Sequence, residues 1–186
     1  NGMAGGLRSS RARLVAAVLP TLVGPVFQEM IQSLNQALDT QGYQLMIGQS
    51  GYENSREDAL LDAIIRRRPD GIVLTGIMHS TTGRRQLIQS GIPVVETWDL
   101  TTTPIDMLVG FSNEEIGAEV CRFLHQRGYR RPALIGGADE RARRRLDGFQ
   151  RMARSLGWVG EVPQFLAPPP TTLAAGRAGL AHLLEH

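Results

Sequence analysis

The sequence contains no lysine, and all 20 of its basic residues are arginines. Set against 18 acidic residues, they leave a formal net charge of only +2. A surface that binds nucleic acid through charge alone needs a larger positive excess. We therefore expect any contact with DNA to come from a local segment or from a part of the protein outside this sequence.

Cysteine and long apolar runs are equally scarce. The single cysteine, Cys121, cannot form an internal disulfide, which fits a reducing compartment. Apolar stretches such as Leu14–Leu19 are much shorter than the roughly 20 residues that cross a membrane, and no charged-then-apolar leader opens the chain. These absences predict a cytoplasmic protein without a membrane partner, in which Cys121 is a buried structural thiol rather than a reactive one.

Motifs for catalysis, metals and cofactors are also missing. The four histidines lack metal-ligand spacing, and the sequence has no Gly-x-Gly-x-x-Gly after a strand, no phosphate loop and no nucleophile elbow. Glu114 and Glu115 stand next to each other, but their place predicts a charge pair at a helix start rather than a catalytic dyad. The sequence therefore predicts no enzyme, no catalytic residue, no metal and no cofactor.

Short apolar runs alternate with amphipathic stretches through the first 111 residues. The helical stretch after the first run places Phe27, Met30, Ile31, Leu34 and Leu38 at three-and-four spacing, which gives one apolar stripe. Such alternation builds a parallel sheet with helices on both of its faces, a doubly wound half. The predicted strands are Leu14–Leu19, Tyr43–Ile47, Ile72–Thr75, Pro93–Glu96 and Met107–Phe111.

A second series of elements begins at Ser112. Ser112 and Glu115 have capping-box spacing before a helix, and a strand at Pro132–Gly137 precedes a helix from about Glu140 to Leu156. A short strand around Gln164–Leu166 and a helix at about 172–185 complete the chain. A sheet of one or two strands keeps an open edge, so we expect this second half to be incomplete as given.

Seven short motifs occur in an order that resembles the lac repressor family. They are residues 1–7, Val18–Pro20 followed by Gly24–Phe27, Arg67–Leu74, Gly91–Val95, Val109–Asn113, Arg127–Arg131 and Arg145–Phe149. Within that family, Val95–Glu96, Trp98–Asp99 and Asp106–Phe111 look most like repressors of gluconate utilisation. Two departures are Trp98, which stands before the aspartate that ends this strand, and Ser112, where an aspartate is common.

The resemblance implies a fold of the type I periplasmic-binding-protein kind, α/β, with two doubly wound parallel-sheet subdomains around an effector cleft. Residues 1–12 would be a hinge segment, 13–111 the N-terminal subdomain, 112–131 a crossover helix and 132–186 the first part of the C-terminal subdomain. An N-terminal helix-turn-helix outside this sequence would bind operator DNA. In the hinge, Leu7 occupies the position that wedges into the minor groove in such repressors.

Candidate effector-binding residues follow from the rule that ligands bind beyond the carboxyl ends of parallel strands. The rule selects Pro20, Thr21, Val26, Phe27, Gln49, Ser50, Thr75, His79, Trp98 and Asp99, and the resemblance adds Arg145. Trp98 would stack on a sugar face or fill the core, and Asp99 would accept a hydroxyl or act as a polar cap. The Arg145 guanidinium suits a sugar-acid carboxylate, the alternative being a solvated arginine in the basic run 141–145.

These inferences converge on a homodimeric transcriptional repressor core that binds a sugar or sugar acid, gluconate-like, and thereby changes its affinity for operator DNA. A periplasmic-type sugar receptor of a transport system shares the fold and is the first alternative. A doubly wound enzyme is the second, and it predicts a nucleotide fingerprint or a catalytic cluster at strand ends.

Overall fold

The computed structural model describes residues 12–22, 25–52, 54–78, 80–158 and 160–185. The chain forms two compact units, Asn1–Val109 and Gly110–His186. Two predicted residues, Leu7 and His79, lie outside the described residues.

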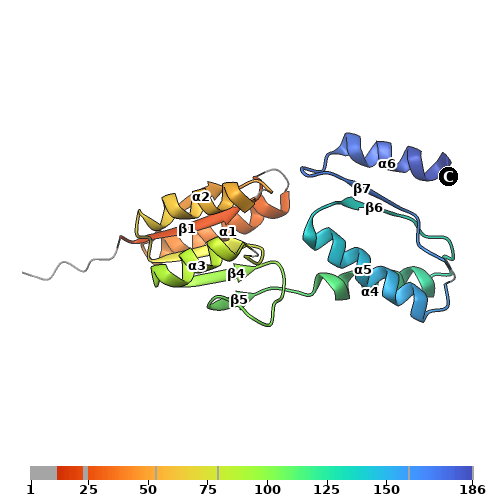
Figure 1. The fold of residues 1–186 in the computed structure, drawn as a ribbon, viewed down its shortest axis with the longest axis horizontal. Coiled ribbons are helices and arrows are strands. Elements are labelled where there is room, and N and C mark those ends of the chain that lie inside the picture. The colour runs from red at the N-terminus through yellow and green to blue at the C-terminus, as the bar shows by residue number, and fades with distance from the viewer. Residues whose placement is uncertain (1–11, 23–24, 53, 79, 159, 186) are drawn as a thin grey trace, which may run out of the picture. The chain divides into compact units, whose positions relative to one another are not determined.

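The first unit is built around a five-stranded sheet. All four strand pairs are parallel, and the strand order is β2-β1-β3-β4-β5 (Figure 1). The strands are β1 (Leu14–Leu19), β2 (Gln44–Gln49), β3 (Gly71–Thr75), β4 (Val94–Thr97) and β5 (Met107–Val109).

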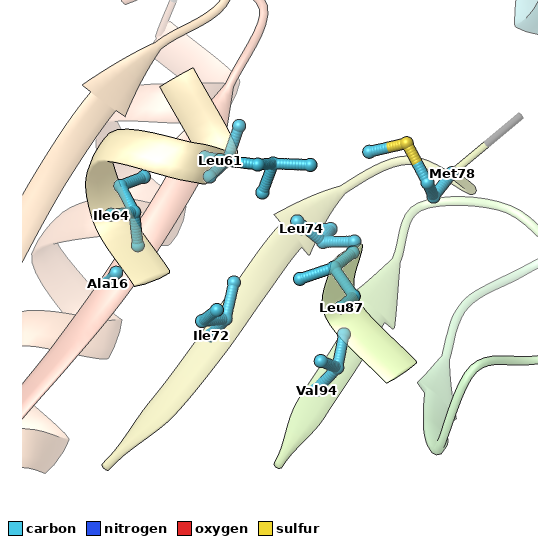
Figure 2. Close-up of a cluster of buried hydrophobic side chains, with 9 residues drawn as sticks. Ala16, Leu61, Ile64, Ile72, Leu74, Met78, Leu87 and Val94 are labelled. Atoms are coloured by element: carbon cyan, nitrogen blue, oxygen red, sulfur yellow. The ribbon is translucent and has the colours of Figure 1, made fainter. Parts of the chain in front are cut away.

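Three helices join these strands: α1 (Pro25–Thr40), α2 (Asn54–Ile65) and α3 (Thr81–Ser90). Leu61 and Ile64 of α2 and Leu87 of α3 pack on one face of the sheet (Figure 2). Successive side chains along a strand point to opposite faces of the sheet. Residues two apart on β1, β3 and β4 therefore belong to this cluster: Ala16, Val18, Ile72, Leu74 and Val94.

The other face of the sheet is also covered. Ala17 and Leu19 point to it and are fully buried, whereas α1 lies along β2 and gives no residue to the cluster on the first face. Helices therefore cover both faces, which confirms the predicted doubly wound arrangement.

Two aspartates fasten the amino ends of the strands. Asp70 Oδ2 accepts the backbone N–H of Leu14, and Asp106 Oδ2 accepts that of Val94, each at 3.2 Å. A backbone N–H at the start of a strand has no ladder partner on one side, so these carboxylates satisfy donors that would otherwise need water. These two hydrogen bonds lie at the opposite ends of the strands from the carboxyl ends, where the candidate site lies.

The second unit contains α4 (Asn113–Gln126), β6 (Leu134–Gly137), α5 (Glu140–Ser155), β7 (Gln164–Ala167) and α6 (Leu173–Glu185). Its sheet has two parallel strands, β6 and β7. The thiol of Cys121 is fully buried against Phe149 and Ala153, and burial raises its pKa. This agrees with the expected structural thiol.

Helices α4 and α5 approach each other through two glycines. A Cβ on Gly117 would overlap the carbonyl oxygen of Arg145, and a Cβ on Gly148 would overlap that of Glu114. Only glycine leaves room for backbones this close. The crossing therefore depends on these two residues rather than on large interlocking side chains.

The predicted order of elements is confirmed throughout, with bounds that differ by one or two residues. The second strand begins at Gln44 rather than Tyr43 and continues to Gln49, because Gly48 and Gln49 pair with the end of β1. Ser112 is the N-cap of α4, and its hydroxyl accepts the N–H of Glu115, as its spacing predicted. Helix α4 is grouped with the second unit, where it packs on α5.

Candidate functional site

The strand order places a natural binding region at the carboxyl edge of the first sheet. The chain moves from β1 outward to β2, and then returns to the other side of β1 with β3. At such a switch point the loops after the two central strands diverge, which opens a crevice beyond the strand ends. Here those loops begin at Pro20, after β1, and at Gly76, after β3.

Phe27 and Trp98 come together at this edge. Phe27 is in the first turn of α1, Trp98 follows β4, and their ring centroids are 5.2 Å apart with a tilt of 38°. The Trp98 indole N–H also donates to Sδ of Met30, at 2.8 Å. Both rings are half-buried, so they support each other and still present an aromatic surface. We refer to this pair as the aromatic pair.

The backbone of Trp98 has φ of 70°, in the left-handed region that a bulky residue seldom adopts. Strain of this kind costs on the order of 1–3 kcal/mol and persists where the surrounding structure fixes it. Fixed strain at a strand end is typical of functional positions, and here it turns the indole towards α1.

The other predicted residues of this edge divide by exposure. Val26 is 54% exposed and Gln49 is exposed, and Pro20 is half-buried. Thr21, Ser50 and Asp99 are buried. The accessible part of the edge therefore combines apolar and aromatic side chains with the polar Gln49, and three further polar residues are buried.

Two of the buried groups have clear local roles. The Ser50 hydroxyl donates to the carbonyl oxygen of Leu19 at 3.3 Å and joins the ends of β1 and β2. Asp99 Oδ1 accepts the N–H of Leu100 at 2.9 Å and shapes the loop after β4. Both side chains thus stabilise the loops of this edge.

Thr75 ends β3, and its hydroxyl oxygen is buried without a hydrogen-bond partner among the described residues. An unpaired buried hydroxyl costs about 1–3 kcal/mol. Since solvent does not reach this atom, a ligand would reach it only after the edge opens.

Glu96 is a buried charged residue beside this edge that the sequence analysis did not select. It is 0% exposed, and its two carboxylate oxygens accept the backbone N–H groups of Met78 and Ile105. In the sequence, a glutamate two residues after Val94 indicates only a polar side chain on a strand. No spacing in the sequence shows that two distant loops return to it.

Arg145 lies in the second unit, on α5. It is half-buried, and its Nη1 donates to Oδ1 of Asn113, the buried first residue of α4. The side chain is therefore partly solvated and partly held by α4. Arg145 also lines a cavity of about 240 Å³ with Gly137, Ala142 and Leu166, at the carboxyl end of β6.

Glu114 and Glu115 pair with arginines on the surface of the second unit. Glu114 binds Arg151 of α5, and Glu115 binds Arg122 at 2.9 Å. Each carboxylate is thus engaged in an ion pair at the start of α4, as a helix-start charge pair predicts.

Among the described residues, no group of three or more histidine, cysteine or carboxylate side chains could hold a metal ion. Over the same residues, no helix has both the length and the apolar character needed to cross a bilayer.

An α/β protein with a parallel sheet covered by helices on both faces belongs to the class of doubly wound proteins. Comparison with known proteins gives the family. Residues 12–184 match the family described as periplasmic binding proteins and sugar binding domain of LacI family. The chain belongs to this family, which confirms the resemblance stated from the sequence.

Relatives within the family are bacterial regulators. The chain is 32% identical over 185 residues to the HTH-type transcriptional regulator GntR of Pseudomonas aeruginosa, a match covering 99% of this chain and 54% of that protein. It is 30% identical to the regulator of the same name from Escherichia coli K12, over 82% of this chain and 46% of that protein. The chain therefore spans about half the length of these curated relatives.

A solved structure agrees with this assignment. The transcription regulator GntR from Chromobacterium violaceum superposes with a TM-score of 0.85 at 35% identity, over 92% of this chain and 64% of that one.

Proposed function

We propose that this chain is the effector-binding core of a transcriptional repressor that responds to a sugar acid such as gluconate. The effector contacts the carboxyl edge of the first sheet, and its binding weakens the hold of the protein on operator DNA. The chain performs no catalysis and needs no cofactor. It works in the cytoplasm, as a homodimer.

The single observation that carries this proposal is the aromatic pair at the carboxyl edge. The faces of pyranose rings and the carbon chains of sugar acids present C–H groups, which pack well against aromatic rings. Phe27 and Trp98 supply such a surface on a strained, tightly held loop end.

Arg145 of the second unit, which the family resemblance adds, is a separate candidate for the polar part of the effector. Guanidinium groups bind carboxylates through two parallel N–H donors. Arg145 Nη1 donates to Oδ1 of Asn113, which holds the side chain in place, and the guanidinium has further N–H donors. The proposal assigns the effector's carboxylate to those donors.

Regulation follows if the effector and the operator favour different conformations. Two ligands that prefer different states oppose each other by a coupling free energy, typically about 1–3 kcal/mol. A helix-turn-helix outside this chain would read the operator, and Leu7 would enter the minor groove beside it.

A thermal-shift screen on the complete regulator tests this function. D-gluconate, other sugar acids and the neutral sugars of matching length are added at equal concentrations. A ligand that binds only the folded protein stabilises it by RT ln(1 + [L]/Kd), which is about 2.7 kcal/mol at a concentration of 100 Kd. We expect a higher melting temperature with a sugar acid and little change with the neutral sugars. A melting temperature that no sugar or sugar acid changes contradicts the proposal.

A further inference from the structure

Glu96 has an unusual environment for an ionisable side chain. It lies on β4, two residues after Val94, and so points to the face of the sheet that α2 and α3 cover. Its side chain is 0% exposed. A buried carboxylate is costly unless donors surround it, so its hydrogen bonds show what it stabilises.

Both oxygens of Glu96 accept backbone N–H groups from loops. Oε1 accepts the N–H of Met78 at 3.0 Å, and Oε2 accepts the N–H of Ile105 at 2.8 Å. Met78 is in the loop between β3 and α3, and Ile105 is in the loop between β4 and β5. One side chain thus holds two loops that are separate in the sequence.

Other bonds anchor the same two loops. The N–H of Gly76 donates to the carbonyl oxygen of Thr97 at 2.9 Å. The Thr97 hydroxyl in turn donates to the carbonyl oxygen of Leu74 at 2.8 Å. Arg84 of α3 donates to the carbonyl oxygen of Thr103 at 2.9 Å. The loop that carries Trp98 is therefore fixed at its start by Thr97 and on its return by Arg84 and Glu96.

We infer that Glu96 is a positioning residue for the effector site, holding the loops after β3 and β4 in the conformation that presents Trp98. This inference rests on the proposed function. A carboxylate suits the task because it is a pure acceptor and meets two N–H donors at once. A glutamine at this place would turn its NH2 group towards one of the two N–H groups and lose that bond.

The test compares E96Q with D106N in the complete regulator, with D-gluconate as the probe in calorimetric titrations. Asp106 makes the same kind of bond, from a carboxylate to a backbone N–H, but at the amino end of the same strand. Because asparagine keeps one acceptor oxygen, D106N removes a carboxylate charge without removing this single bond, and it is a matched control for the loss of charge. Hydrogen exchange of the peptides around Met78 and Ile105 is measured in parallel.

We expect E96Q to bind gluconate about tenfold more weakly, equivalent to about 1.4 kcal/mol, and D106N to bind within about twofold of the wild type. Exchange around Met78 and Ile105 should rise in E96Q and stay unchanged in D106N. If only the carboxylate charge mattered, and not the two hydrogen bonds, the two variants would lose affinity equally. That result, or an E96Q that binds like the wild type, overturns the inference and leaves the proposed function intact.

Two further outcomes are also decisive. If E96Q does not fold, R84A loosens the same loop from the exposed side of α3, and an unchanged gluconate affinity in R84A overturns the inference. If the wild type itself binds neither gluconate nor any other sugar acid or sugar, the proposed function fails, and the inference fails with it.

Discussion

At the scale of single residues, two arrangements shape the candidate site: the contact between Phe27 and Trp98, and the two hydrogen bonds that Glu96 accepts. The rule for strand ends selected Phe27 and Trp98 separately, since each directly follows a strand or opens the next helix. Their contact at 5.2 Å could not be predicted, because it depends on the path of the loop after β4 and on a left-handed backbone at Trp98. The same holds for Glu96, whose two partners are 18 and 9 residues away along the chain.

Arg145 gives the first prediction at this scale. Replacing it with methionine keeps the length of the side chain and removes every N–H donor. We expect R145M to bind a sugar acid at least tenfold more weakly, a loss of about 1.4 kcal/mol or more, and to bind a neutral sugar as the wild type does. Titration calorimetry with D-gluconate and with a neutral sugar of the same length measures both affinities.

The matched control for this change is R143M. Arg143 is exposed on the same helix and donates to the carbonyl oxygen of Ala138. The variant R143M should bind gluconate with the affinity of the wild type. Equal affinities of R145M and R143M for gluconate would show that Arg145 is held by Asn113 for structure alone.

At the scale of helices and strands, periodicity predicted the elements well and their ends less well. Apolar residues recur at every second position of a half-buried strand and at every third or fourth position of an amphipathic helix, because those positions face the core. The core of the first unit follows these spacings closely. The ends of strands depend on where a neighbouring strand stops pairing, as Gly48 and Gln49 show at the end of β2. Such pairing joins distant segments, so local patterns do not show it.

The crossing of α4 and α5 carries the second prediction. A Cβ at Gly117 would overlap the carbonyl oxygen of Arg145, so G117A must push the two helices apart. We expect this change to lower the free energy of unfolding by about 3 kcal/mol or more, at the upper end of overpacking effects. Urea unfolding followed by circular dichroism measures it.

Gly176 of α6 supplies the control for this prediction. Apart from its chain neighbours and the backbone of its own helix, no atom of the described residues lies within 4 Å of the place that its Cβ would occupy. Because alanine is a better helix former than glycine, G176A should stabilise the protein by about 0.5–1 kcal/mol. If both alanine variants changed stability by the same amount, the close crossing of α4 and α5 would not be a feature of the native protein.

For the molecule as a whole, the account links an effector to operator DNA. Thermodynamic linkage requires that each ligand weaken the other by the same factor, typically 5- to 150-fold. We expect saturating D-gluconate to lower operator affinity by such a factor, measured by fluorescence anisotropy with labelled operator. Operator DNA should lower gluconate affinity equally. An operator affinity that saturating gluconate leaves unchanged would show that the two sites are not coupled.

Leu7 separates the two halves of this linkage. An apolar wedge in the minor groove contributes to DNA binding and has no part in the effector site. L7A should therefore weaken operator binding and leave gluconate affinity in the absence of DNA unchanged.

The two tryptophans allow the most direct test of the central claim, that the carboxyl edge of the first sheet binds the effector. Trp98 lies at that edge, whereas Trp158 packs against Phe149 and His125 in the second unit. In W158F, the emission of Trp98 should change on titration with D-gluconate, and the change should saturate. In W98F, the emission of Trp158 should stay constant and gluconate should bind more weakly. Emission in W158F that stays constant while gluconate binds, together with wild-type affinity in W98F, would contradict the account.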